Sequence, residues 1–596
     1  MSVLDRIERL RNVMEQQKID CYIIPTDDYH HSEYVGDYFK FREYITGFTG
    51  SAGTAVFTKD KAGLWTDGRY FIQAEAQLKG SGITLYKSGE SDVPTIEEFL
   101  KSELKEGDVL GFDGRTVTYA QGKRYCHIAD ENGASLKYSL DFAQNIWKER
   151  PEMSMESVFS LADEYTGEKI GSKLERIREI MKENGCNAHV LSSLDDIAWL
   201  LNIRGNDIAY CPLVLSYAIV YNNSVELFAD IRKFSDDIIN LLAENQVKIY
   251  PYEDIYRKVS EMTSEDKLLL DSAIMNYSLY QAISKETVIV DKQNPEILMK
   301  SVKNETQAEN LRKAHLKDAV AHIKFMYWLK KNIGRVEITE LSASARLEGL
   351  RAEQEHFLGP SFGPISAYGE HGAIVHYSAD EKSNVPLKEG KLFMTDTGGH
   401  YLEGSTDITR TVALGEVGNI EKEHFTLVAR AMLRLANTVF LYGCSGANLD
   451  CIAREVFWKE GLNFNHGTGH GVGYLLNIHE GPINFRWKEG ERPAPALEEN
   501  MVITDEPGIY IEGSHGIRLE NELLVRKTVK NEYGQFMNFE ILTYVPIDLD
   551  AILPEKMSTE EKEMLNHYHK QVYEKVSPYL SEEERIWLKE YTRAVK

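Results

Sequence analysis

The sequence predicts a chain of α/β and α+β class, built from two duplicated α/β domains followed by a larger domain that carries the chemistry. Three observations lead to this prediction. At 596 residues the chain is too long for one hydrophobic core, because domains usually hold roughly 100–200 residues. The N-terminal half contains repeated segments, and acidic and histidine motifs gather between residues 373 and 521.

The repeats are segments of similar sequence that occur twice in the N-terminal half. R-I-E-R-L-R at 6–11 recurs as K-L-E-R-I-R at 173–178, which is 167 residues later. Y-I-T-G-F-T-G at 44–50 recurs as W-L-L-N-I-R-G at 199–205, which is 155 residues later. The first copy therefore holds about a dozen extra residues, which we place within 28–41. Similarity over this length indicates duplication of a whole domain.

The repeats also set the expected boundaries. We expect domains at residues 1–155, 156–300 and 301–596, the last with a C-terminal extension from about 535 to 596. Alternating helical and strand patterns in each copy are typical of a mixed sheet with flanking helices. The final segment, from Ser558, shows helical spacing that indicates internal packing or, alternatively, a subunit contact.

The first copy opens with helical spacing of apolar residues from Leu4 to Met14, followed by an apolar strand at Cys21–Ile24. Neither copy shows a phosphate-binding glycine loop or a nucleophile constellation. His30 and His31 are adjacent in a polar loop. Such histidines are more often solvated than bound to metal, and we interpret them as solvated.

Composition excludes several classes of protein. The formal net charge of -25 argues against a nucleic acid or an anionic membrane as partner, since either needs a basic face. The charged N-terminus does not resemble a signal peptide. The apolar run Cys211–Tyr221 is shorter than the roughly 20 residues that span a bilayer. Six scattered cysteines fit free thiols, so we expect a cytoplasmic protein.

Two aspartates lie on what reads as one tight hairpin, between Thr395 and Thr411. An apolar run leads into Asp396, and a β-branched run follows Asp407. If the two residues are directly opposed, their Cβ atoms lie roughly 4.5–5.5 Å apart. Two anions at that separation repel one another, and a metal ion is the simplest remedy.

A second hairpin repeats this arrangement with two glutamates. Apolar strand patterns contain Glu506 and Glu520, and the turn residues between them are centred on Gly513. A hairpin with this centre sets the two carboxylates opposite each other. The sequence thus offers two pairs of facing acids.

Between the hairpins lies a glycine-rich histidine loop, His466-Gly-Thr-Gly-His470-Gly-Val-Gly, followed by His479. Its glycines exclude the helix that a zinc-protease H-x-x-x-H motif needs. They do allow the backbone to approach an ion closely. Only one of these histidines need be a ligand.

Taken singly, each of these residues has an ordinary explanation. An acid at a strand end is usually a cap or a surface residue, and a histidine in a glycine loop is usually a core polar group or a phosphate contact. Together, two Asp, two Glu and one His form an oxygen-rich set that favours manganese or magnesium over zinc. Four carboxylates exceed what one divalent ion needs for charge balance, so two ions fit better. Two ions roughly 3.5–4 Å apart lower the pKa of bound water and stabilise an oxyanion.

Five motifs, in this order along the chain, resemble the pita-bread metallopeptidases, the family of methionine aminopeptidase, prolidase and aminopeptidase P. They are Ala373-Ile-Val-His376-Tyr, Thr395-Asp396-Thr-Gly-Gly, Thr406-Asp407-Ile-Thr-Arg-Thr, His466-Gly-Thr-Gly-His470 with His479-Glu-Gly-Pro, and Asp505-Glu506-Pro-Gly with Arg518-Leu-Glu520-Asn. Within the family, the chain is most similar to the long, three-domain form of aminopeptidase P. That form has two creatinase-like N-terminal domains before a pita-bread catalytic domain.

The resemblance implies a role for each motif residue. It implies two manganese ions, with Co²⁺ or Zn²⁺ as substitutes in vitro, held by Asp396, Asp407, His470, Glu506 and Glu520. Asp407 and Glu520 would bridge the ions, and Glu506 would also act as general base. The implied substrate-binding and proton-shuttling histidines are His376, His466 and His479. Arg518 is expected to support the ligands, because a fixed cation keeps acids ionised.

The implied activity is release of the N-terminal residue from Xaa-Pro-Yaa peptides through a metal-bridging hydroxide. The two N-terminal domains would wall the cleft of a cytoplasmic homodimer. One alternative is a prolidase restricted to Xaa-Pro dipeptides, which a comparison of dipeptide with tripeptide distinguishes. Another is a non-catalytic pita-bread protein that binds peptides or proteins, against which the complete set of ligands counts.

Overall fold

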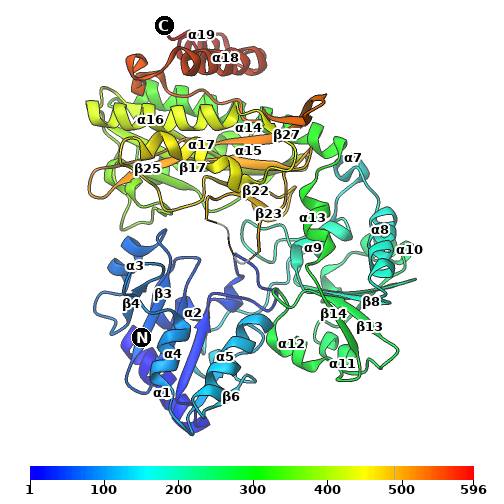
Figure 1. Ribbon diagram of the computed structural model, residues 1–596. Coiled ribbons are helices and arrows are strands. Elements are labelled where there is room, and N and C mark those ends of the chain that lie inside the picture. Colours follow the sequence, from blue (N-terminus) through cyan, green and yellow to red (C-terminus); the bar gives the residue numbers. More distant parts are fainter. Residues whose placement is uncertain (489, 491) are drawn as a thin grey trace. The chain divides into compact units, whose positions relative to one another are not determined.

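The computed structural model describes residues 1–488, 490 and 492–596. The chain divides into two compact units (Figure 1). One comprises Met1–Leu161 and Glu168–Ile297, and the other comprises Ala162–Gly167 and Leu298–Lys596.

The first unit contains two six-stranded sheets with equivalent strand orders, β4-β3-β2-β1-β5-β6 and β12-β11-β10-β8-β13-β14. In each sheet the central strand, β1 or β8, pairs antiparallel on one side and parallel on the other. The strands of the first sheet are β1 Cys21–Pro25, β2 Thr54–Thr58, β3 Ala62–Thr66, β4 Thr84–Lys87, β5 Val109–Phe112 and β6 Ser135–Lys137. Those of the second are β8 Ala188–Leu191, β10 Tyr217–Tyr221, β11 Val225–Phe228, β12 Val247–Tyr250, β13 Lys267–Leu270 and β14 Val288–Asp291. The shared topology confirms the predicted duplication.

Helices flank both sheets. The predicted N-terminal helix is α1, which begins with a capping box between Ser2 and Asp5 and buries Ile7, Leu10 and Met14. The longer helices of this unit are α1 Val3–Gln17, α4 Ile96–Glu103, α5 Tyr119–Glu131, α8 Ile170–Glu183 and α10 Asp236–Glu244. The predictions of a helix and then a strand at the start of the chain are confirmed.

The extra residues of the first copy lie where the repeat offsets placed them. Residues 26–40 separate β1 from α2 (Phe41–Thr46), whereas only residues 192–193 separate β8 from α9 (Leu194–Leu200). The interpretation of His30 as solvated is wrong. His30 is 2% exposed, with Nδ1 2.9 Å from the Ser192 carbonyl oxygen and Nε2 2.6 Å from the Tyr252 hydroxyl. This loop is buried because it packs against the second copy.

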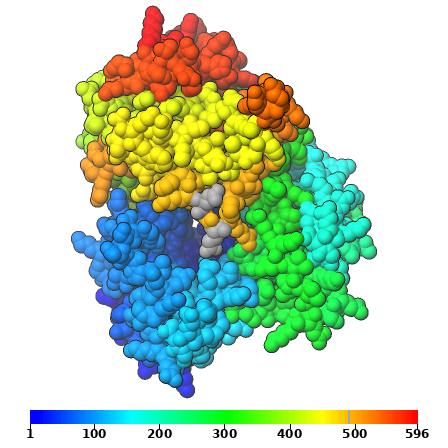
Figure 2. All heavy atoms as spheres, in the orientation of Figure 1, coloured from blue at the N-terminus to red at the C-terminus, as the bar shows by residue number. Residues whose placement is uncertain are grey.

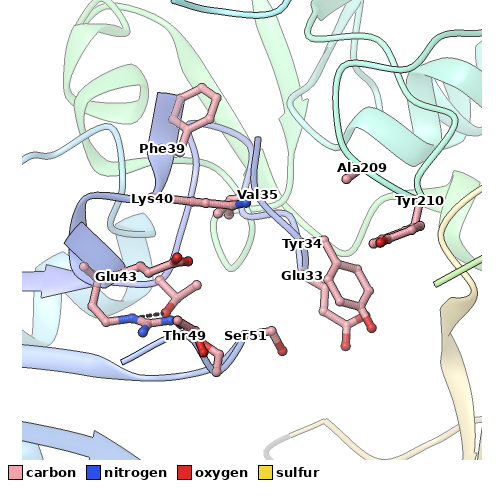
Figure 3. A pocket seen from close by; sticks show the side chains of 13 residues that line it. Glu33, Tyr34, Val35, Phe39, Lys40, Glu43, Thr49, Ser51, Ala209 and Tyr210 are labelled. Carbon is pink, nitrogen blue, oxygen red and sulfur yellow. Dashed lines mark hydrogen bonds between the residues drawn. The ribbon is translucent and has the colours of Figure 1, made fainter. Parts of the chain in front are cut away.

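A cavity of about 180 Å³ lies in the first unit, next to the same loop (Figure 3). The side chains of Glu33, Tyr34, Lys40 and Tyr210 line it. Arg42 lines it too, but this guanidinium is committed to the backbone, since it donates to the carbonyl oxygens of Phe48 and Gly50.

The second unit is built around a six-stranded sheet with order β21-β28-β27-β24-β22-β23, joined by smaller sheets β16-β17-β20, β15-β18-β19 and β25-β26. Helices α14 Glu305–Asn332, α15 Glu340–Ala352, α16 Asn419–Ala436 and α17 Gly446–Trp458 pack with these sheets around one hydrophobic core. The large-sheet strands are β21 Phe440–Leu441, β22 Gly469–Val472, β23 His479–Phe485, β24 Val502–Asp505, β27 Asn521–Asn531 and β28 Gly534–Ile541. The short strands are β15 Phe357–Pro360, β16 Ile365–Tyr368, β17 Lys391–Thr397, β18 Gly399–Tyr401, β19 Gly404–Ser405, β20 Ile408–Leu414, β25 Gly508–Ile511 and β26 His515–Arg518.

The C-terminal segment forms helices α18 Thr559–Val576 and α19 Glu582–Tyr591. They pack on α14 and α16, and the red end of the chain covers one side of the second unit (Figure 2). Leu565, Tyr568 and Val572 are buried, so this helical stripe packs within its own unit. Among the described residues, no helix is long and apolar enough to cross a membrane.

Candidate metal centre

The first pair of acids lies on two adjacent strands, but not in the predicted register. Asp396 on β17 is opposite Thr409 on β20, and Asp407 immediately precedes β20. The prediction that Asp396 directly opposes Asp407 is therefore wrong. The connection is not a tight turn, since it contains β18 and β19, which form a ladder of their own. Thr409 is directly opposite Asp396, and opposed residues share a face of the sheet. Asp407 lies two residues before Thr409, so it also lies on the face that carries Asp396.

The second pair follows the predicted register. In β25 and β26, Gly508 is opposite Arg518, and in β24 and β27, Asp505 is opposite Asn521. The same register runs through both ladders and sets Glu506 against Glu520 in the gap between them. The hairpin centre at Gly513 is confirmed.

His470 on β22 directs one ring nitrogen at these acids. Its Nδ1 lies 2.9 Å from the carbonyl oxygen of Gly471. A carbonyl only accepts, so Nδ1 carries the proton and Nε2 keeps its lone pair. Nε2 lies 3.5 Å from an oxygen of Asp407 and 3.7 Å from one of Glu506. Such a tautomer, fixed by a backbone acceptor, is that of a metal-binding imidazole.

The glycines beside His470 allow two strands to approach closely. A Cβ on Gly469 would lie 1.9 Å from the Thr504 carbonyl oxygen, and one on Gly471 would lie 2.2 Å from the Glu480 carbonyl oxygen. No larger residue fits at either position. These glycines therefore let β22 carry His470 between its neighbouring strands.

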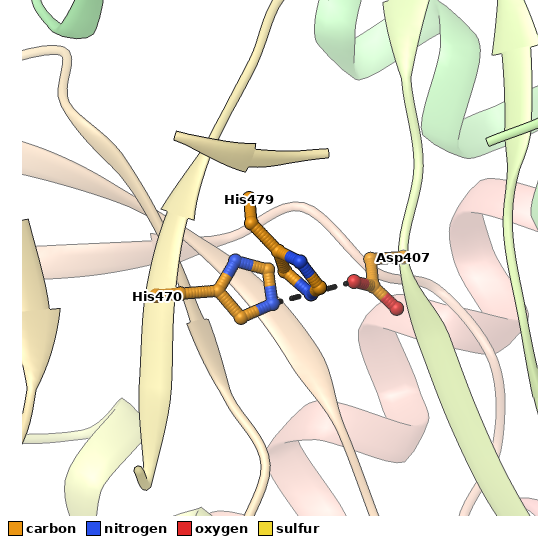
Figure 4. Close-up of side chains that lie close together, drawn as sticks. All are labelled: Asp407, His470 and His479. Atoms are coloured by element: carbon orange, nitrogen blue, oxygen red, sulfur yellow. Dashed lines mark ion pairs between the residues drawn. The ribbon is translucent and has the colours of Figure 1, made fainter. Parts of the chain in front are cut away.

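Three overlapping groups of side chains each offer ligand atoms that lie within 4.8 Å of one another. Every ligand that the resemblance implied belongs to at least one group, and His479 joins them. The groups are Asp407, His470 and His479; His470, Glu506 and Glu520; and Asp396, Asp407 and Glu520. In Figure 4, His470 and His479 both turn toward Asp407. His376 and His466 belong to none of these groups, for which only the described residues count.

Burial and mutual repulsion act strongly on these acids. Burial, followed by the charges of neighbouring acids, raises the pKa of Asp407 and of Glu520 well above the usual range. Burial also raises the pKa of Glu506. Buried carboxylates this close must bind protons or cations.

The donor set fits divalent ions. Oδ1 of Asp396 is buried, and in the part of the chain that the structure describes it has no hydrogen-bond partner. One oxygen of Glu520 accepts from the Thr409 hydroxyl at 2.7 Å. Four carboxylates and one imidazole suit hard, octahedral ions, and four carboxylates exceed the charge that one divalent ion balances.

Arg518 is a buried cation that holds Asp396, one of these acids, in place. It is 2% exposed, and its Nε and Nη2 donate to the same oxygen of Asp396 at 3.2 and 2.5 Å. Its Nη1 donates to the Tyr510 hydroxyl at 2.7 Å. That hydroxyl lies 2.8 Å from Nε2 of His466.

His466 remains neutral in this chain of contacts. Its Nδ1 lies 2.7 Å from the carbonyl oxygen of Gly467, so Nδ1 donates and Nε2 accepts from Tyr510. Burial and then the charge of Arg518 lower the pKa of His466 to about 3. The imidazole therefore orients Tyr510 rather than carrying a charge at neutral pH.

Several supporting residues escaped the sequence reasoning. Tyr510 joins Arg518 to His466. Oε1 of Glu522 accepts from the Asp407 backbone N–H at 2.6 Å, and Oε2 lies 3.1 Å from Nε2 of the buried His315. The contacts of Tyr510 with His466 and of Glu522 with Asp407 and His315 join residues far apart in the chain, so no local pattern signals them.

Arg410 ties Glu520 to the C-terminal extension. Its Nη1 donates to the carbonyl oxygen of Glu520. Its Nη2 donates to the Asn521 side chain and to the Tyr568 hydroxyl, both at 2.7 Å. Since Tyr568 belongs to α18, the extension contacts Arg410, the residue that binds the backbone of Glu520.

Comparison with known proteins agrees with this geometry. Residues 309–527 match the model of metallopeptidase family M24, and 535–595 match the C-terminal region of that family. Residues 6–137 and 149–307 each match a creatinase/prolidase N-terminal domain.

Full-length relatives include "Xaa-Pro aminopeptidase 1" of Dictyostelium discoideum, 36% identical over 97% of this chain and 94% of the relative. Another is "Aminopeptidase P1" of Arabidopsis thaliana, 34% identical over 99% of both chains. Among solved structures, an X-prolyl aminopeptidase from Caenorhabditis elegans, described as a cytosolic enzyme with a di-nuclear active site, has a TM-score of 0.95 at 33% identity. The match covers 100% of both chains. The chain therefore belongs to metallopeptidase family M24 and carries the creatinase/prolidase N-terminal domain twice.

Proposed function

We propose that this chain is an aminopeptidase that releases the first residue from peptides with proline at the second position. The observation that carries the proposal is the convergence of Asp396, Asp407, His470, Glu506 and Glu520 in overlapping groups of ligand atoms. These residues would hold two divalent ions, for which we propose manganese, with Asp407 and Glu520 shared between them. The names of the full-length relatives support the substrate class.

When bound, the two ions supply an ionised water as nucleophile and positive charge for the oxyanion of a tetrahedral intermediate. The protein residues move the proton. Glu506 takes it from the attacking water and delivers it to the leaving nitrogen, which becomes the secondary amine of proline. In the metal-free chain, burial raises the pKa of Glu506 above its usual range.

The histidines position the substrate. His479 stands edge-on to His470, with 4.3 Å between the ring centroids, and can donate to the substrate from beside the ligand set. We assign His376 to the same role. It follows Val375, whose carbonyl oxygen accepts from Arg518 at 3.4 Å. His466 acts through Tyr510, as described above.

A dedicated site for such peptides has a physical reason. The amide nitrogen of an Xaa–Pro bond has no hydrogen, so a peptidase that recognises a backbone N–H at that position binds these peptides poorly. The nearest rival function is a prolidase restricted to dipeptides. A Bacillus anthracis Xaa-Pro dipeptidase structure covers 64% of this chain at 24% identity, which shows the fold alone. The full-length relatives favour the aminopeptidase.

Further properties belong to the same proposal. We propose domains at 1–155, 156–300 and 301–596, a homodimer, and a cytoplasmic location. The family matches to each part support the domains, and the description of the C. elegans enzyme as cytosolic supports the location. Light scattering after size-exclusion chromatography tests the dimer.

The activity test compares Xaa-Pro-Yaa with Xaa-Pro. The tripeptide should be cleaved after its first residue, EDTA should abolish cleavage, and Mn²⁺ should restore it. Asp407→Asn, which removes a proposed ligand, should lower the rate of cleavage. Asp92→Asn makes the same change at an exposed turn with φ of 65° and serves as its matched control. Cleavage of the dipeptide alone would establish the prolidase instead. Failure to cleave either substrate in the manganese-loaded protein would favour the non-catalytic alternative.

A further inference from the structure

The loop that carries His376 follows β16, a strand that pairs with the strand of Asp396. Ile365 on β16 is opposite Asp396 on β17, and this ladder runs as far as Tyr368. A short 3₁₀ helix, Gly369–Ala373, begins the loop. Since His376 lies beyond the end of the ladder, contacts other than this strand pairing must fix its position.

Glu340 is a buried residue that contacts this loop at three places. It is 0% exposed and is the first residue of α15. Its Oε1 accepts from the backbone N–H of Tyr368 at 2.7 Å and lies 2.8 Å from Nδ1 of His371. Its Oε2 accepts from the hydroxyl of Tyr377 at 2.9 Å. The two oxygens of one carboxylate thus hold both ends of the segment 368–377.

The surroundings of Glu340 suit a carboxylate that accepts hydrogen bonds. A negative side chain in the first turn of a helix is stabilised by the helix dipole. The hydrogen bond to Glu340 raises the pKa of His371, so this imidazole donates to the carboxylate. Burial raises the pKa of Tyr377, and the charge of Glu340 adds to the rise, which keeps the hydroxyl a donor. Hydrogen bonds to an ionised acceptor are stronger than neutral ones.

Apolar packing fixes the aromatic ring of Tyr377. The ring belongs to one buried cluster with residues of β16 and β17: Ile365, Ala367 and Met394. It also stacks on the imidazole of His371, with 4.5 Å between the ring centroids. Tyr377 is thus packed against the strand that carries Asp396, and its hydroxyl reaches Glu340.

His376 lies between two neighbours that are both held. On one side, the carbonyl oxygen of Val375 accepts from Nη2 of Arg518 at 3.4 Å. On the other side, the Tyr377 hydroxyl donates to Glu340. A residue between two fixed neighbours has little backbone freedom left to lose when it binds a ligand. The position of His376 therefore depends on Arg518 and Glu340 together.

The start of the loop also lies directly against β26. A Cβ on Gly516 of β26 would lie 1.6 Å from the carbonyl oxygen of Gly372. Only glycine fits at residue 516, because any side chain there would push the loop away. Arg518 lies two residues further along the same strand. The loop therefore packs on the strand whose arginine binds Asp396 and Val375.

We propose that Glu340 is a positioning residue, which holds the loop 368–377 so that His376 contacts the substrate. Glu340 acts through the loop and takes no part in the bond-breaking step. This inference rests on the proposed aminopeptidase function and on the role assigned to His376 there. It requires that the contacts of Glu340 affect catalysis through His376.

The test is a measurement of coupling, with kcat/KM for Ala-Pro-Ala determined in the manganese-loaded full chain. Tyr377→Phe removes one hydrogen bond to the Glu340 carboxylate and should lower kcat/KM about tenfold, as expected for a hydrogen bond to a charged group. In a His376→Ala background the same substitution should lower kcat/KM less than about twofold. An equal loss in both backgrounds would overturn the proposal, since Tyr377 would then act without His376.

Tyr442→Phe is the matched control. The Tyr442 hydroxyl donates to Oε1 of Glu498 at 2.7 Å, so this substitution removes the same kind of hydrogen bond elsewhere in the second unit. It should leave kcat/KM unchanged. Metal analysis should find the same manganese content in Tyr377→Phe as in the wild type. A loss of manganese in Tyr377→Phe would overturn the proposal, because the substitution would then act on the ligand set.

Hydrogen exchange measured by mass spectrometry supplies a readout that needs no turnover. Tyr377→Phe and Glu340→Gln should each speed exchange in the segment 368–377 about tenfold, and should leave exchange in α16 unchanged. Unchanged exchange of the loop in both variants would overturn the proposal. Absence of cleavage of Ala-Pro-Ala by the wild type would instead count against the proposed function.

Discussion

Arg518 donates two hydrogen bonds to one oxygen of Asp396, and the other oxygen of that carboxylate is buried without a hydrogen-bond partner in the described part of the chain. The guanidinium therefore orients the carboxylate, which offers a ligand atom in the group formed with Asp407 and Glu520. A buried arginine of the second unit thus fixes the position of one candidate metal ligand.

Replacing Asp407 should have opposite effects on activity and on the stability of the metal-free protein. Asp407→Asn removes a ligand that we propose is shared by both ions, and it should lower kcat/KM roughly a thousandfold or more. In EDTA the same variant should melt at a higher temperature than the wild type, because burial and neighbouring acids raise the pKa of Asp407 and its removal relieves that cost. A peptide-cleavage assay with Mn²⁺ measures kcat/KM, and scanning calorimetry in EDTA measures the melting temperature. A lower melting temperature in EDTA would contradict the electrostatic account.

The contact between Arg410 and Tyr568 should tune metal affinity from the C-terminal extension. Tyr568→Phe removes the hydroxyl that accepts from Arg410, and we expect manganese affinity to fall about tenfold, as for other residues that orient metal ligands. Tyr579→Phe is the control, since Tyr579 is 59% exposed. Equilibrium dialysis against Mn²⁺ provides the measurement. Unchanged affinity with an unchanged melting temperature would show that the extension does not position Glu520.

His569 should make the stability depend on pH. Its Nε2 accepts from the Ile547 N–H at 3.0 Å, and burial, followed by the charge of Arg410, lowers its pKa to about 3. A histidine with a depressed folded pKa stabilises the protein fully above its unfolded pKa of about 6.5, and this contribution is lost as pH falls toward 3. Between pH 7 and pH 5 the loss is about 2 kcal/mol.

His569→Gln keeps an acceptor for Ile547 and should remove this part of the pH dependence. Urea denaturation in EDTA at pH 5 and pH 7 gives the comparison. His127→Gln, at a side chain that is 70% exposed, should leave it in place. The same loss of stability in His569→Gln as in the wild type would refute the assignment.

The buried pair of Lys303 and Glu480 should show strong coupling. Lys303→Met removes the buried ammonium that is paired with the Glu480 carboxylate and should cost about 3–5 kcal/mol of unfolding free energy. Glu480→Gln in the same chain should recover much of this loss. A double-mutant cycle by urea denaturation measures the coupling. Additive effects of the two substitutions would show that the pair is not coupled.

The second hairpin was predictable because its turn is short and both of its strands keep one register. Glu506 and Glu520 are equally distant from Gly513, and the two ladders on either side of them keep the same register. The first hairpin was not, because β18 and β19 lie within its connection. Strands of two or three residues leave no periodicity to detect.

Contacts between distant segments were also beyond prediction. His30 is buried by Ser192, which is 162 residues away. Glu522, Tyr510 and Arg410 act on the ligands through pairings that only the folded sheet creates. By contrast, His470 stood out in the sequence, because its glycines serve a local need for close approach.

The most direct test of the central claim is the number of metal ions that the five ligand residues hold. Mass spectrometric metal analysis of the manganese-loaded chain should give two ions per chain in an enzyme that cleaves Xaa-Pro-Yaa, and fewer than one in Asp407→Asn. An active wild type with no bound metal, or an Asp407→Asn variant that retains two ions and full activity, would contradict the account.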